Sequence, residues 1–204
     1  MSATERARRL PVRRHARESG VAAIEVALLA SVFFTLVFGV MELARAVYVF
    51  NTMFEATRYA ARAAATTSHR DGDTLDRIRQ RAMFRASPGN LVFGAPVNDG
   101  NVKFDYLALT RAADGSMSLD EIPAGSLPAT ARQNREICMT NPNAANCIRF
   151  VRARICAETG VTDCDQAVFR PILPMLSFWF RVPRATTVRP VESFGSMPGV
   201  TPAP

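Results

Sequence analysis

The chain has 204 residues, of which 48% are hydrophobic, and this size and composition fit a folded protein of one or two domains. Its net charge is +7, but residues 1–20 carry six arginines and two glutamates and so account for +4 of it. The positive charge therefore indicates membrane topology, and a nucleic-acid partner is not expected.

Residues 1–20 are predicted to be a basic cytoplasmic leader, whose arginines include Arg13, Arg14 and Arg17. Residues 21–44, VAAIEVALLASVFFTLVFGVMELA, follow directly and are the most hydrophobic stretch of the chain. They are long enough to cross a bilayer, which takes about 20 mostly apolar residues in a helix. Clustered arginines keep the adjoining end of such a helix in the cytoplasm. The sequence therefore predicts a single-pass membrane protein, with a cytoplasmic N-terminus and a C-terminal domain outside the cytoplasm.

An acidic residue lies inside the apolar stretch, near its start. Glu25 is the fifth residue after Gly20, which ends the leader. A carboxylate at the bilayer centre costs about 2.5–3.5 kcal/mol, so such residues usually have a partner or a role. The alternative is that Glu25 lies at the level of the lipid headgroups and has no role.

The helical pattern continues beyond the apolar stretch, over residues 45–67. Apolar residues recur there at alternating steps of three and four, which predicts an amphipathic helix that packs on a soluble domain. Glu55 and Arg58 are three apart and are expected to support this helix as an ion pair. The predicted apolar stripe consists of Val47, Phe50, Phe54, Thr57, Ala61 and Ala64.

Residues 68–193 are predicted to form a periplasmic α+β domain, in which the sheet is antiparallel. Asp73 is expected to cap a short helix over residues 74–85, and Asp114-Gly115 to turn a hairpin. A strand is predicted in CIRFVRARICAE, with Val151, Ala153 and Ile155 on one side and Arg152 and Arg154 on the other. An edge strand is predicted near Pro190. The remaining elements are a hairpin of 101–110 with 116–120, a helix in 129–139, a buried strand or helical turn in 174–182, and a disordered tail over 194–204.

The chain has four cysteines, and no histidine or Cys-x-x-Cys pair accompanies them, so no metal site is predicted. An oxidising compartment favours disulfides, for which three pairings are possible. The pairs Cys138–Cys147 and Cys156–Cys164 are favoured, because each closes a short loop around a turn-forming segment.

Signs of catalysis are absent from the sequence. His15 lies in the leader and His69 in a polar break, and no nucleophile spacing or phosphate-binding loop occurs. The sequence therefore predicts a protein that is not an enzyme and holds no cofactor.

The basic leader, Gly20, Val21 and Glu25 together resemble the start of a type IV prepilin. With FGVMELARAVYVFN and EATRYAARAAA further along, residues 20–66 are similar to the TadE-like family of pseudopilins from tight-adherence pilus systems, and PRATTVRPVES is a weaker likeness near the C-terminus. Val26 and residues 58–62 depart from the common family pattern, which leaves TadE, TadF and TadG-like types open.

The resemblance implies that a prepilin peptidase cuts between Gly20 and Val21 and leaves the helix in the mature protein. The new amine at Val21 would then lie one helical turn from Glu25, within one subunit or across two. The implied protein is a pseudopilin or minor pilin, whose partners are the membrane, the peptidase, other pilin-like subunits and pilus assembly proteins. The alternatives are an uncleaved, membrane-anchored binding or sensor domain and a tethered enzyme, for which the sequence offers no site.

Overall fold

The computed structural model describes residues 18–157, 164–172, 180–181, 184–192 and 194. The chain divides into two compact units, residues 1–42 and residues 43–204. Helix α1 (Glu18–Thr66) begins in the first unit and ends in the second. The fold is α+β, as predicted, because a long N-terminal helix is followed by a small antiparallel sheet.

The sheet of the second unit has four strands in the order β2-β1-β3-β6. These are β1 (Val102–Arg111), β2 (Met117–Glu121), β3 (Phe150–Ile155) and β6 (Thr186–Pro190), and all neighbouring pairs are antiparallel. The predicted hairpin is confirmed: β1 turns into β2 at Gly115, whose φ of +87° suits glycine. Pro190 lies in the edge strand β6, as expected for a residue without an amide hydrogen.

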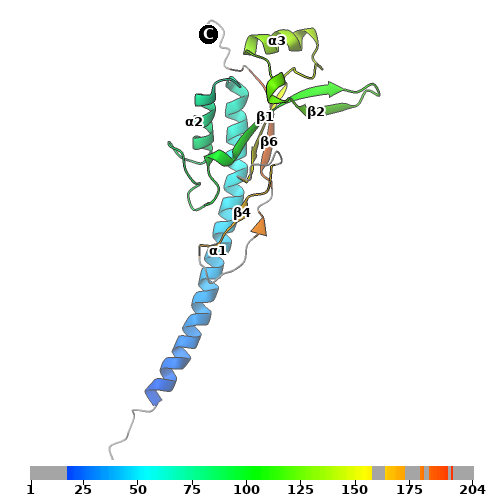
Figure 1. Ribbon diagram of the computed structural model, residues 1–204. Helices are drawn as coiled ribbons and strands as arrows, with labels where there is room; N and C mark the ends of the chain where they lie inside the picture. Colours follow the sequence, from blue (N-terminus) through cyan, green and yellow to red (C-terminus); the bar gives the residue numbers. More distant parts are fainter. Residues whose placement is uncertain (1–17, 158–163, 173–179, 182–183, 193, 195–204) are drawn as a thin grey trace, which may run out of the picture. The chain divides into compact units, whose positions relative to one another are not determined.

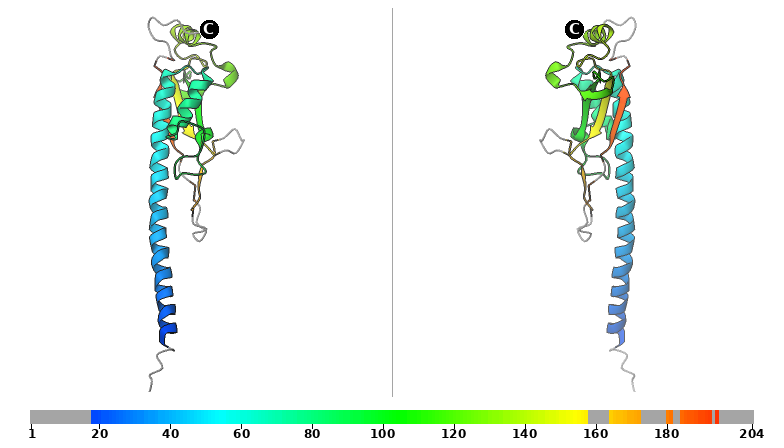
Figure 2. Two further views of the ribbon diagram at one scale, coloured as in Figure 1. Left: turned by 90° about the vertical axis from the view of Figure 1, so that its left-hand side faces the viewer. Right: turned by 90° about the vertical axis from the view of Figure 1, so that its right-hand side faces the viewer.

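The C-terminal half of α1 runs alongside the strands, as both views of Figure 2 show. The Oγ1 atoms of Thr57 and Thr187 lie 3.0 Å apart, and the backbone amide of Glu192 donates to the carbonyl of Ala65 at 3.1 Å. The buried face of α1 is lined mainly by small side chains, which let the sheet approach the helix closely: Ala46, Val49, Met53, Ala56, Thr57, Ala60, Ala61 and Ala64.

The predicted stripe on this helix was therefore only partly right. Thr57, Ala61 and Ala64 are buried, but Val47 is 52% exposed, and Phe50 and Phe54 are only partly buried. The apolar residues of α1 fall on two adjacent faces that share the same three- and four-residue spacing. The sheet packs on the face with alanines because it has less bulk between the two backbones.

Helix α2 (Gly72–Ala82) confirms the first predicted short helix; it buries Leu75, Ile78 and Ala82 and lies beside the end of α1 (Figure 1). Its cap is Asp71 and not Asp73, since Asp71 Oδ1 accepts the amide of Thr74 at 3.0 Å. The helix also ends three residues earlier than predicted.

Helix α3 (Ala131–Thr140) confirms the second predicted helix, and Thr130 caps it by accepting the amide of Gln133. The shorter elements are η1 (Asp99–Asn101), η2 (Ala124–Ser126) and the pair β4 (Val168–Phe169) and β5 (Phe180–Arg181). Most of the apolar run 174–182 falls outside the described residues. The predicted tail does too, apart from Phe194, which is buried in the core.

His69, which the sequence places in a polar break, is buried in the second unit. Its side chain packs edge-on against Tyr106 and Phe194, with ring centroids 5.5 and 5.4 Å apart, and its Nε2 lies 2.7 Å from the carbonyl oxygen of Pro128. Burial lowers the pKa of His69 below its ordinary value and outweighs the backbone contact with Pro128, which raises it. The folded protein therefore favours the neutral imidazole.

We expect the second unit to lose stability as the pH falls below about 6.5, where an unperturbed histidine takes up a proton. Between that value and the lower pKa of folded His69, the unfolded chain binds more protons, so acid favours unfolding; above about 6.5 the full stability is present. Thermal unfolding of the full-length protein in detergent from pH 7.5 to 5 measures this slope. His69→Gln should flatten the slope, and an equal slope in both proteins would contradict the prediction.

Candidate functional site

The part of α1 in the first unit exposes an apolar surface. Within residues 20–66 an 18-residue window has a mean hydropathy of 2.4, and none of that window is buried. By length and composition the helix is able to cross a membrane. Large apolar side chains are exposed in successive positions around it, which is typical of a helix surrounded by lipid or by other helices. They include Val21, Ile24, Leu28, Leu29, Val32, Phe33, Leu36 and Val40.

The predicted processing residues lie in the first turns of α1. The helix begins at Glu18, so the Gly20–Val21 bond lies in its first turn, where backbone amides have no partner within the helix. Val21 and Glu25 are both exposed and lie one turn apart, on the same side of the helix. A Cβ atom added at Gly20 would meet nothing within 4 Å, so packing does not require a glycine there. The predicted topology residues Arg13, Arg14 and Arg17 lie outside the described residues.

Arg45 is the first residue after the apolar stretch and connects α1 to two distant segments of the second unit. Its Nε donates to the carbonyl of Phe93 at 2.7 Å, and its Nη1 donates to the carbonyl of Arg170 at 2.9 Å. Its guanidinium also lies 4.5 Å from the centre of the Phe169 ring. Sequence analysis missed this role. The only available signal was a lone arginine directly after the apolar stretch.

The outer face of the sheet carries four charged side chains in one network. Arg152 and Arg154 on β3 both contact Asp105 on β1, at 2.8 Å from Arg152 Nε and at 2.5 Å from Arg154 Nε. Arg152 also contacts Glu121 on β2 at 2.6 Å. The predicted alternation of β3 is confirmed: Val151, Ala153 and Ile155 are buried in the core. The pairing of these arginines with Asp105 was not predicted.

The four cysteines form the two disulfides that the sequence analysis favoured. Cys138 on α3 pairs with Cys147 before β3, and their Cα atoms are 5.1 Å apart. Cys156, directly after β3, pairs with Cys164, with Cα atoms 4.7 Å apart. Each closes a short loop and is expected to add about 2–3 kcal/mol to the free energy of unfolding.

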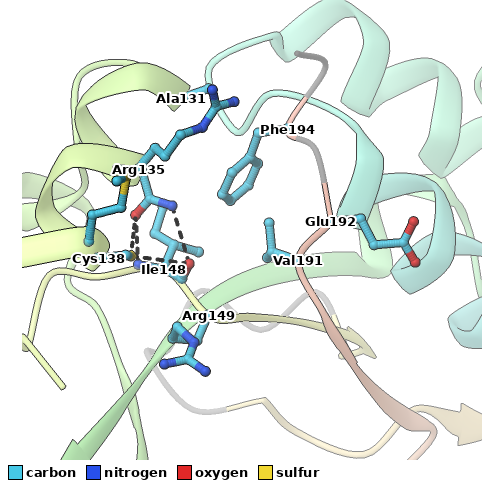
Figure 3. A pocket seen from close by; sticks show the side chains of 10 residues that line it. Ala131, Arg135, Cys138, Ile148, Arg149, Val191, Glu192 and Phe194 are labelled. Carbon is cyan, nitrogen blue, oxygen red and sulfur yellow. Dashed lines mark hydrogen bonds between the residues drawn. The ribbon is translucent and has the colours of Figure 1, made fainter. Parts of the chain in front are cut away.

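The hollows on the surface of the second unit include two that described residues line. One, of about 270 Å³, lies beside α3, where Val191 and Phe194 face Cys138 and Ile148 (Figure 3). The side-chain amide of Asn134 is buried at this hollow and already has protein partners. It donates to the backbone carbonyl of Ile148 at 3.2 Å and accepts from the backbone amide of Ile148 at 2.8 Å. Within the described residues no group of three or more His, Cys, Asp and Glu could hold a metal ion.

The other hollow, of about 490 Å³, lies between the end of α1 and the residues around β6. Its lining includes Tyr59 and Arg62 from α1, Arg189 from β6 and Glu192 just after it. The end of α1 and the residues around β6 therefore lie next to each other, although more than a hundred residues separate them in the sequence.

Residues 20–62 match the model of a protein family described as TadE-like protein, which confirms the resemblance. The match begins at Gly20, ends within α1 and covers less than half of the chain. No curated protein and no solved structure matches the chain. The family match and the apolar helix together support a membrane protein related to the tight-adherence pilus.

Proposed function

We propose that the protein is a TadE-like pseudopilin or minor pilin, a non-enzymatic subunit that takes part in assembling a tight-adherence pilus or a related secretion apparatus. The observation that carries this proposal is the family match, which starts at Gly20 and continues along the exposed apolar helix. A prepilin signal consists of a basic leader, a glycine and an acidic residue early in such a helix, and Gly20 and Glu25 have that arrangement here.

The proposed mechanism begins with insertion into the bacterial inner membrane. Arg13, Arg14 and Arg17 keep the N-terminus in the cytoplasm, so the second unit reaches the periplasm, where both disulfides form. A prepilin peptidase then removes residues 1–20 on the cytoplasmic side. The apolar surface of α1 can pack laterally against other pilin-like subunits, because the most apolar 18 residues of the helix are not buried within the chain itself.

N-terminal sequencing of the protein, purified from bacteria that contain a prepilin peptidase, tests the proposal. The mature chain is expected to begin at Val21. Gly20→Leu should keep its leader, because a large side chain crowds the cleavage site of the peptidase. The space around Gly20 is open, so this substitution leaves the packing of the chain unchanged, and Gly20→Ala is the matched control that should still be cut. A wild-type chain that retains its leader would contradict the proposal.

The second candidate function is an uncleaved, membrane-anchored binding or sensor domain. The observation in its favour is the 490 Å³ hollow, where Arg62 and Arg189 make no side-chain hydrogen bond or ion pair with other described residues. Two guanidinium groups at one hollow suit an anionic ligand. The same sequencing experiment separates the two functions, since an anchored sensor keeps its leader.

A further inference from the structure

The loop of residues 91–97, between α2 and β1, carries two successive apolar side chains that point away from the core. Val92 is 44% exposed and Phe93 is 71% exposed. The residues at both ends of the loop, Leu91 and Val97, are buried, and the amide of Leu91 donates to the carbonyl of Val97 at 2.8 Å. The loop is therefore closed at its base, and its apolar tip faces outward.

The backbone at this tip adopts a conformation that bulky residues rarely take. Phe93 has a φ of +55°, in the left-handed region where glycine and asparagine are the usual residues. At the next position, Gly94, a larger residue does not fit without a shift of Leu91, because an added Cβ would lie 2.6 Å from Leu91 Cδ2. A strained aromatic side chain that is held outside the core indicates a role for it beyond folding.

Contacts within the second unit place this tip beside the residue that follows the apolar stretch of α1. Arg45 donates to the carbonyl of Phe93 at 2.7 Å and lies 3.4 Å from the carbonyl of Ala95. It also binds the carbonyl of Arg170, two residues before Ile172, which is 63% exposed. If residues 21–44 span the membrane, Arg45 lies at the membrane surface, and the tip of the loop lies there with it.

We propose that Val92 and Phe93 insert into the headgroup region of the periplasmic leaflet and hold the second unit against the membrane. This inference rests on the proposed function, because it requires α1 to span the bilayer. The ligand is the lipid surface itself: aromatic side chains are favoured at the membrane interface, and apolar burial there drives peripheral binding.

Fluorescence quenching by brominated lipids tests the proposal on the full-length chain in phosphatidylethanolamine–phosphatidylglycerol vesicles. The single tryptophan, Trp179, is first replaced by phenylalanine, and a new tryptophan is placed at one position at a time. Phe93→Trp reports the loop, and Phe33→Trp reports the apolar part of α1. Met139→Trp is the matched control, because Met139 is 78% exposed on α3, at the other end of the sheet (Figure 2).

Lipids brominated near the headgroup should quench Phe93→Trp several-fold more strongly than Met139→Trp, and more strongly than lipids brominated deep in the acyl chain do. Val92→Trp should behave in the same way and provides the test if Phe93→Trp does not fold. Equal quenching of Phe93→Trp and Met139→Trp would overturn the inference. So would blue-shifted emission without quenching, which would mean that protein covers the tip. In either of these two outcomes, quenching of Phe33→Trp would still support a membrane-spanning α1. An unquenched Phe33→Trp would overturn both the membrane-spanning helix and the lipid contact of the loop.

Discussion

Asp105→Ala is expected to lower the free energy of unfolding of the second unit by about 3–5 kcal/mol, the usual cost of removing one partner from a buried ion pair. The side chain of Asp105 is only 8% exposed and accepts hydrogen bonds from Arg152 and Arg154, each at 2.8 Å. Without this carboxylate, the two partly buried guanidinium groups lose the buried acceptor that they share, and Glu121, which also contacts both, is 52% exposed. The remaining charge is then poorly compensated on the outer face of the sheet.

Glu121→Ala is the matched control for this prediction. Glu121 contacts the same two arginines, but its side chain is 52% exposed, so water replaces its contribution and the expected cost is about 0–1 kcal/mol. Urea unfolding of the full-length protein in detergent, followed by a signal from the sheet, measures both variants. Equal midpoints for Asp105→Ala and Glu121→Ala would show that the network contributes no more than surface charges do.

The parts of the fold that the sequence predicts are those decided by local patterns. Alternation along β3 separates buried Val151 and Ala153 from Arg152, and the turn at Asp114-Gly115 sets the hairpin. The disulfide pairing was predictable for the same reason, since each bridge closes a loop of eight or nine residues. These features depend on residues close in sequence, so spacing and turn chemistry are sufficient to find them.

The features that the sequence did not reveal depend on residues far apart. His69 is polar by type and follows a helix, yet Pro128, Tyr106 and Phe194 enclose it. The face of α1 that is buried depends on which side the sheet approaches, and the spacing of apolar residues fits two adjacent faces equally well. The role of Arg45 depends on carbonyl groups 48 and 125 residues away. No periodicity in a single segment carries such information.

Within the candidate site, the family resemblance implied the predicted processing residues, and the structure describes their surroundings. Gly20 and Glu25 were assigned this role because the basic leader, the glycine and the early glutamate resemble the start of a type IV prepilin. The structure adds that Gly20 has open space around it and that the helix already includes the predicted cut. The sequence alone could not predict the proposed lipid contact of Val92 and Phe93, because these residues follow Arg45 by 47 and 48 positions in the chain.

Glu25→Ala is expected to leave cleavage intact but to abolish assembly. The proposed processing would create an amine at Val21, one helical turn from Glu25. Within one subunit or between two, this amine and the carboxylate would lower each other's free-energy cost in an apolar environment. Removing one member of such a pair costs about 3–5 kcal/mol, which corresponds to roughly a 10²–10⁴-fold weaker association. Co-purification with other pilin-like subunits should fall accordingly, while N-terminal sequencing still finds Val21.

Glu55→Ala is the matched control on the same helix. Glu55 pairs with Arg58 at 2.6 Å, but both side chains are about 60% exposed, so its loss should leave assembly almost unchanged. Gly20→Leu tests the mechanism further, because a retained leader leaves no amine at Val21. If the amine is the partner of Glu25, then adding Glu25→Ala to Gly20→Leu should weaken association little more than either change alone. A processed Glu25→Ala chain that co-purifies like the wild type would rule out the ion pair as the basis of assembly.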